Sequence, residues 1–86
     1  MTISDNNVFA SVVAIVSDLF GIDSATLNMD STRESVEGWD SLQQVNLIID
    51  VESHFGLHLS EAEIARVQGI RDIVEIVSKK KSFSDN

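Results

Sequence analysis

The amino-acid sequence predicts an all-α fold, a small antiparallel four-helix bundle with a long first loop and a short third helix. Three observations carry this prediction. The chain has 86 residues, enough for one domain with one small core. It contains no proline and only four glycines, so few residues would interrupt a helix. Its valine, isoleucine and leucine residues recur at the three- and four-residue spacing of one helix face.

Residues 8–20 are predicted to form the first helix. Its apolar face consists of Val8, Val12, Ile15, Val16 and Leu19, with Phe9, Val13 and Phe20 beside it. Ser4 or Asp5 is expected to cap the start of this helix, and Gly21 to follow its end. A strand is the alternative because many of these residues are β-branched. The segment is long for a strand, however, and its apolar residues do not alternate with polar ones.

Residues 21–40 are predicted to form a long loop, because serine, threonine, asparagine and aspartate dominate this segment. Scattered apolar residues, Trp39 among them, are expected to pack this loop over the core. Loops of this length are uncommon in compact domains and are often functional. The second helix is predicted over residues 41–55, with Asp40 or Ser41 as its N-cap. Along this helix one predicted stripe comprises Leu42, Val45, Ile48, Ile49, Glu52 and Phe55, with Leu47 and Val51 beside it.

Two more helices are predicted in the last third of the chain. The segment Ser60–Glu63 has the S-x-x-E pattern of a capping box and starts a short third helix that ends near Val67. Gly69 separates it from a fourth helix. The apolar face of that helix comprises Ile70, Ile73, Val74 and Val77. Residues 79–81 are three lysines, which we expect in its last turn, where cations favour the negative end of the helix dipole.

The charge of the chain excludes several classes of partner. Fourteen acidic residues against six basic ones give a formal net charge of −8. We therefore expect neither nucleic acid nor an anionic membrane as a partner, but enzymes with basic docking patches. The longest apolar run, residues 12–16, is too short to span a bilayer. We expect a cytoplasmic monomer with one domain over residues 1–86, ordered from about residue 4 to about residue 81 and frayed beyond.

The sequence lacks a recognisable catalytic or metal-binding constellation. His54 follows Ser41 by 13 residues in the same predicted helix, which places them about 20 Å apart, beyond hydrogen-bond reach. An EF-hand-like spacing in the long loop fails because Arg33 replaces the required glycine and Trp39 the final glutamate. We therefore expect no catalytic residues, no metal ligands and no enzymatic activity.

Ser41 is the candidate functional residue. It stands where the long loop meets the start of a helix. Backbone N–H groups at such a position lack intrahelical partners, and the helix dipole is positive there. A phosphate ester on the Ser41 hydroxyl would therefore be electrostatically favoured. The residues alone leave an alternative open, in which Ser41 is only the N-cap of the helix.

The stretch GWDSLQQVNLIIDVESHFG, residues 38–56, resembles the signature of acyl carrier proteins and related carrier domains. In that family the sequence Asp-Ser-Leu opens the second helix, and its serine carries 4′-phosphopantetheine as a phosphodiester. Residues 69–74 resemble the start of the family's last helix, although Gly69 stands where a threonine cap is usual. The resemblance covers roughly residues 8–80 and implies that Ser41 is the attachment site.

The resemblance implies a carrier protein and not an enzyme. A phosphopantetheinyl transferase would attach the arm to Ser41 from coenzyme A, with Mg²⁺. The arm would hold acyl intermediates as thioesters for loading and synthase enzymes of fatty-acid, polyketide or related specialised acyl metabolism. One alternative is a peptidyl or aminoacyl carrier with the same arm. The other is an unmodified acidic helical interaction module.

Residues around Ser41 are the candidates for partner recognition. Asp40 matches a motif position that the transferase recognises, and it is equally a candidate N-cap. Leu42 matches a residue that contacts partner enzymes, with core packing as the alternative. The other candidates are Glu37, Leu47, Asp50, Val51 and Glu52. Gln43 and Asn46 stand where housekeeping carriers usually have acids, which favours a specialised carrier.

Overall fold

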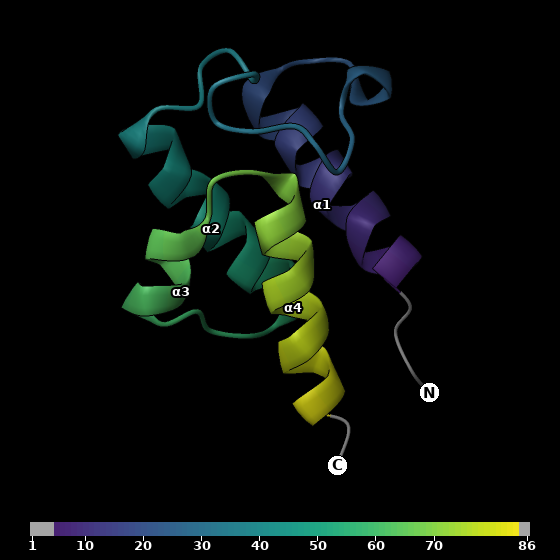
Figure 1. Cartoon of the computed structure of the whole chain (residues 1–86), viewed down its shortest axis with the longest axis vertical. Coiled ribbons are helices and arrows are strands. Elements are labelled where there is room, and N and C mark those ends of the chain that lie inside the picture. The colour runs from purple at the N-terminus through teal and green to yellow at the C-terminus, as the bar shows by residue number, and fades with distance from the viewer. Residues whose placement is uncertain (1–4, 85–86) are drawn as a thin grey trace.

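The computed structural model describes residues 5–84, and this part of the chain is helical throughout its regular structure. The elements are α1 (Asp5–Phe20), the 3₁₀ helix η1 (Ser24–Thr26), α2 (Ser41–Phe55), α3 (Glu61–Arg66) and α4 (Ile70–Ser84). Helix α1 runs opposite to α2 and α4, the short α3 lies beside them, and the long loop crosses one end (Figure 1). The predicted all-α class, the helix order and the short third helix are confirmed. Ser4, one of the two predicted caps of the first helix, lies outside the described residues.

The core is built from valine, isoleucine and leucine side chains of the three long helices and their connections. Its largest fully buried side chains are Val8, Val12, Val16, Leu47, Val51, Leu59, Val67, Ile70, Ile73 and Val77. Many of these are β-branched and favour strands by local propensity alone. Burial of one apolar face outweighs that propensity, because most helix stability in a folded protein comes from packing.

The buried face of α2 differs from the predicted stripe. The buried residues of this helix are Gln44, Leu47, Ile48 and Val51. Leu42 is 71% exposed, and Val45 and Ile49 are each 55% exposed, so their predicted place on the core face is wrong. Positions 44, 47, 48 and 51 have helical spacing, but the polar side chain of Gln44 hides that pattern in the sequence.

The long loop is fastened to the connection between α3 and α4. The backbone N–H of Arg33 donates to the carbonyl of Gln68 at 2.8 Å, and the N–H of Ile70 donates to the carbonyl of Ser31 at 3.0 Å. Between these bonds, Gly69 forms an isolated antiparallel bridge with Thr32. A Cβ atom on Gly69 would lie 2.4 Å from the Ser31 carbonyl oxygen, so this close approach requires glycine. The loop is thereby held against the helices.

The ends of the last two helices confirm one prediction and correct another. Ser60 and Glu63 form the predicted capping box, and Val67 caps the end of α3. Helix α4 continues to Ser84. Asp85 and Asn86 lie outside the described residues, and the predicted fraying of this end stays a prediction. Of the three lysines at 79–81, only Lys81 lies in the last turn. The other two were predicted there because the length of this helix was underestimated.

The described helices include none with both the length and the apolar character that a membrane span requires.

Candidate functional site

Ser41 is the first residue of α2, at the point where the long loop ends. Its side chain is exposed. Within residues 5–84 its hydroxyl takes part in no hydrogen bond. Helix α2 begins at the end of the molecule opposite to the start of α1 and the end of α4 (Figure 1). The hydroxyl is therefore open to an incoming enzyme.

Asp40, and not Ser41, is the N-cap of α2. Its backbone is extended, with φ −100° and ψ −173°. Its carboxylate oxygen Oδ1 accepts a hydrogen bond from the backbone N–H of Gln43 at 2.9 Å. Its carbonyl accepts from the N–H of Gln44 at 2.9 Å. The alternative in which Ser41 serves only as the cap is therefore wrong, because the neighbouring aspartate fills that position.

The electrostatics of this helix start suit a phosphodiester. The first turn of α2 contains no acidic residue. Backbone N–H groups in a first turn lack intrahelical acceptors, and the helix dipole places partial positive charge there. The Asp40 carboxylate accepts a hydrogen bond from the N–H of Gln43. The backbone N–H groups closest to Ser41 are therefore left for another acceptor. The residues present therefore fit a 4′-phosphopantetheine group on Ser41.

The segment before Ser41 is anchored by Trp39, as predicted. Trp39 is only 5% exposed. Its ring lies against Phe20 at the end of α1, with 5.7 Å between ring centroids. Its indole Nε1–H donates to Oε1 of Gln44 at 2.6 Å. Gly38, with φ +91°, allows the chain to turn into this position.

Gln44 continues this contact to α3. Its amide Nε2 lies 3.4 Å from the carbonyl oxygens of Ile64 and Val67, at the end of α3. Sequence reasoning missed this residue. The signal that identifies it is its place on the buried 44, 47, 48, 51 face of α2, where every other member is apolar.

The candidate recognition residues divide into exposed and buried sets. Glu37, Asp40, Leu42 and Asp50 are exposed; the first three lie within four residues of Ser41, and Asp50 follows it by nine residues on α2. Leu47 and Val51 are 0% exposed, which contradicts their predicted role in contacting partners. The reason is that α2 turns them into the core together with Ile48. Val45 and Ile49 were assigned to the core and instead join Leu42 on the surface.

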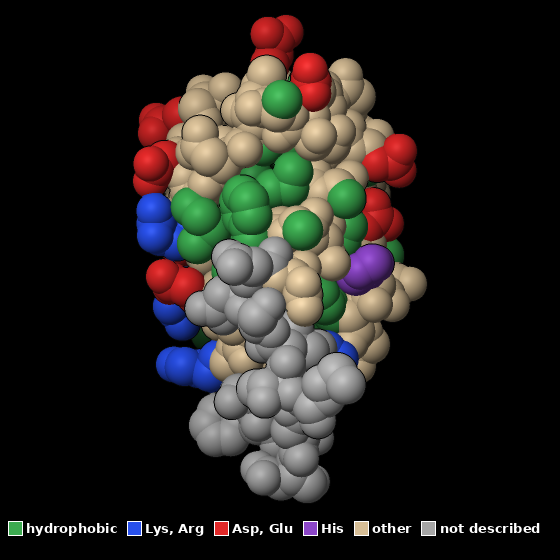
Figure 2. All heavy atoms as spheres, turned by 90° about the vertical axis from the view of Figure 1, so that its right-hand side faces the viewer, with side chains coloured by type: hydrophobic (Ala, Val, Ile, Leu, Met, Phe, Trp, Pro, Cys, Tyr) green, Lys and Arg blue, Asp and Glu red, His purple; other side chains and the backbone are tan. Residues whose placement is uncertain are grey.

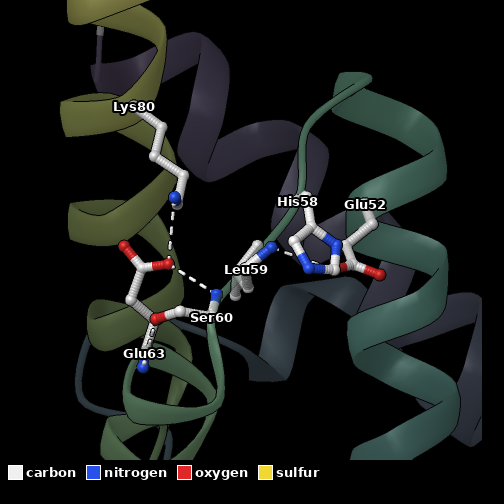
Figure 3. A network of polar contacts seen from close by, with 6 residues as sticks. All are labelled: Glu52, His58, Leu59, Ser60, Glu63 and Lys80. Carbon is white, nitrogen blue, oxygen red and sulfur yellow. Dashed lines mark hydrogen bonds and ion pairs between the residues drawn. The ribbon is translucent and has the colours of Figure 1, made fainter.

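Glu52, the remaining candidate, is engaged within the chain. Its Oε2 accepts a hydrogen bond from the backbone N–H of Leu59 at 2.9 Å. Nδ1 of His58 lies 3.2 Å from the same oxygen. Figure 3 shows this carboxylate pointing from α2 to the connection that leads into α3. In this structure Glu52 therefore fixes the α2–α3 connection, and its role toward partners stays a prediction.

A second set of polar contacts joins α3 to α4 (Figure 3). The backbone N–H of Ser60 donates to Oε1 of Glu63 at 2.8 Å, and Nζ of Lys80 lies 2.9 Å from the same oxygen. The hydrogen bond from Ser60 and then that from Lys80 lower the pKa of the Glu63 carboxyl below its ordinary value of 4.5. Both contacts favour the charged carboxylate.

Catalytic geometry is not found around Ser41. His54 is exposed and lies on the same helix, 13 residues and about 20 Å further along, so the two cannot form a nucleophile–base pair. Among the described residues, no three or more histidine, aspartate or glutamate side chains are grouped to hold a metal ion.

An open hollow lies on the face that α1 forms, where apolar side chains gather (Figure 2). Its apolar lining comes mainly from Phe9, Ala10, Val13, Ala14, Ile22 and Leu27. It shares no residue with the start of α2.

Comparison with known proteins agrees with this site. The chain matches the family described as phosphopantetheine attachment site over residues 10–77, a range that includes Ser41. The acyl carrier protein of Thermotoga maritima is 31% identical over 77 residues, which cover 90% of this chain and 95% of that protein. Those of Solidesulfovibrio magneticus and Clostridium acetobutylicum are 32% and 33% identical, covering 87% and 81% of this chain and 96% and 91% of their own lengths. The chain thus belongs to the acyl carrier protein family and contains its phosphopantetheine attachment domain.

Proposed function

We propose that this chain holds acyl intermediates as thioesters on a 4′-phosphopantetheine arm attached to Ser41. The observation that carries the proposal is the position of the Ser41 hydroxyl. It is exposed, it has no hydrogen-bond partner within residues 5–84, and it opens a 15-residue helix whose N-cap is supplied by Asp40. We further propose that the cargo belongs to fatty-acid, polyketide or related specialised acyl metabolism.

Attachment of the arm is a phosphoryl transfer in which the chain is the acceptor. The Ser41 oxygen forms a bond to the phosphorus next to the pantetheine part of coenzyme A. The bond from that phosphorus to the bridging oxygen breaks, and adenosine 3′,5′-bisphosphate leaves. The serine proton must pass to a base. His54 lies about 20 Å away along α2, and the neighbouring Asp40 carboxylate accepts a hydrogen bond from the Gln43 N–H as the helix cap. A separate phosphopantetheinyl transferase therefore supplies the base and Mg²⁺.

Once the arm is attached, its thiol is the only thiol of the carrier, because the chain itself contains no cysteine. An acyl group delivered by a loading enzyme therefore has one thiol to acylate. Acyl carrier proteins are carriers and not catalysts, and the distance between Ser41 and His54 is in keeping with that role.

An exposed apolar strip on α2 is the proposed docking surface for partner enzymes. Leu42, Val45 and Ile49 are more than half exposed and follow one helix face from the residue next to Ser41. An enzyme that acts on the arm must approach this end of α2. Apolar contact with the strip would supply affinity, and the acidic groups Glu37 and Asp50 would attract basic patches and raise the association rate.

Intact mass measurement tests the attachment site. Apo protein, coenzyme A, Mg²⁺ and a transferase of broad specificity are expected to yield a mass gain of one phosphopantetheine. Ser41→Ala is expected to abolish the gain. Ser53→Ala is the matched control, because Ser53 is an exposed serine of the same helix, and this variant should be modified like the wild type. An unchanged mass of the folded wild type, or a gain that survives Ser41→Ala, would contradict the proposal.

A further inference from the structure

We propose that Gln44 is a positioning residue for the attachment site, an inference that rests on the proposed role of Ser41. Through Trp39 it fixes the backbone from which Ser41 is presented, and through two carbonyls of α3 it ties that backbone to the third helix.

The contact between Gln44 and Trp39 brackets Ser41 along the chain. Trp39 precedes Ser41 by two residues and Gln44 follows it by three. Their side chains are 5% and 8% exposed, and they share a hydrogen bond of 2.6 Å. The Trp39 ring also packs on Phe20 of α1. The turn that leads into Ser41 is thus held between α1 and α2 by buried groups, although Ser41 itself is exposed.

The amide of Gln44 is engaged at both of its polar atoms. Its oxygen accepts from Trp39, and its nitrogen reaches the carbonyls of Ile64 and Val67 at 3.4 Å. The rest of this α2 face is apolar, and an apolar side chain would fill the same space without the need for partners. The contribution specific to Gln44 is therefore its set of hydrogen bonds, which link the loop before Ser41 to α3.

Loss of these bonds would release the segment before Ser41. The hydroxyl would then be presented in several backbone arrangements, of which an enzyme binds one. The apparent Michaelis constant for the carrier rises as the competent fraction falls, while the rate within the bound complex is unchanged. A KM effect without a kcat effect on phosphopantetheine transfer is therefore the expected signature of a positioning role.

The test uses Gln44→Met, which keeps the length of the side chain and removes its amide. Gln43→Met is the matched control, because Gln43 is the next residue and its Oε1 accepts only from Asn46, at 2.8 Å. Initial rates of phosphopantetheine transfer are measured by intact mass at saturating coenzyme A, at a temperature where circular dichroism shows each variant to be folded. We expect KM for Gln44→Met to rise at least about fivefold with kcat within about twofold, and Gln43→Met to match the wild type.

A double-mutant cycle separates positioning from general destabilisation. Trp39→Phe removes the indole donor but keeps an aromatic ring to pack on Phe20. If Trp39 and Gln44 act as one unit, the double variant raises KM no more than either single variant. Fully additive effects would overturn the proposal, as would a wild-type KM for Gln44→Met.

Acrylamide quenching gives a readout that needs no transferase. Trp39 is the only tryptophan in the chain, so all tryptophan fluorescence comes from the residue that contacts Gln44. In the apo protein, Gln44→Met is expected to increase the quenching constant, and Gln43→Met to leave it unchanged. An unchanged constant for Gln44→Met would overturn the proposal even if the wild type were never modified. If the wild type is not modified but Gln44→Met increases the quenching constant, the role of Ser41 is refuted, while the contact by which Gln44 fixes Trp39 is supported.

Discussion

Replacing Gly69 by alanine would push a methyl group against the long loop. The added Cβ would lie 2.4 Å from the Ser31 carbonyl oxygen and 3.1 Å from Cα of Thr32, and both neighbours are backbone atoms. The loop must therefore move away from the start of α4. That movement breaks or strains the hydrogen bond from Ile70 to Ser31 at 3.0 Å and the one from Arg33 to Gln68 at 2.8 Å.

The expected size of this effect follows from the two bonds. Breaking two backbone hydrogen bonds costs about 1–3 kcal/mol in total at the net value of a protein hydrogen bond. The reduced entropy of the unfolded chain offsets about 0.4–1 kcal/mol of this. Mid-range values predict that Gly69→Ala lowers the free energy of unfolding by about 1.3 kcal/mol, within a range of about 0–2.6 kcal/mol, which is a fall of roughly 5–10 °C in Tm for a chain of this size.

Urea unfolding followed by circular dichroism measures the change in the free energy of unfolding. A second variant, Gly69→Thr, distinguishes loss of a cap from a steric clash. Threonine is the usual cap at this place in the family, and as an effective cap it would regain about 0.5–2 kcal/mol relative to alanine. The geometry predicts instead that threonine is no more stable than alanine, because both carry the Cβ that meets Ser31. Stability equal to or above the wild type in either variant would refute the reasoning.

Three further outcomes are expected. Asp40→Ala should lower the free energy of unfolding by about 0.5–2 kcal/mol, and Ser41→Ala by less than about 0.5 kcal/mol; the reverse order in urea titrations would refute the cap assignment. Because the pKa of Glu63 is lowered in the folded state, its contribution to the free energy of unfolding is fully present above pH 4.5 and is lost as the pH falls through the lowered pKa. Glu63→Gln should therefore flatten the fall of stability below pH 4.5. An unchanged slope of stability against pH would contradict this. Ile49→Ala should weaken binding of an acyl-loading enzyme by about tenfold in a titration with little loss of stability. Leu47→Ala should instead destabilise the fold by about 2–5 kcal/mol, and equal effects of the two on stability would refute the assignment of faces.

Local signals predicted the starts of α2 and α3 well. The capping box of Ser60 and Glu63 lies within four residues of sequence, and so does the cap that Asp40 provides next to Ser41. The Gly69 contact could not be predicted, because its partner Ser31 lies in a loop far away in sequence and no local pattern encodes that meeting. The contact explains why a residue that looks like a lost cap is in fact required for close packing.

The prediction for α2 failed because this helix is apolar on two faces. One face packs into the core through Leu47, Ile48 and Val51, and the other shows Leu42, Val45 and Ile49 to solvent. Hydrophobic periodicity identifies a helix, but it cannot choose between two apolar faces.

Core packing does not explain why Leu42, Val45 and Ile49 are apolar, because Leu47, Ile48 and Val51 form the apolar part of the buried face of α2 without them. Three large apolar side chains more than half exposed on one helix face are unfavourable in water, and on this acidic chain they begin beside Ser41, the proposed attachment site. The residues that periodicity would bury are thus the ones that form the proposed docking surface. Affinity for those partners should therefore depend on apolar contact at this strip as well as on the net charge of −8.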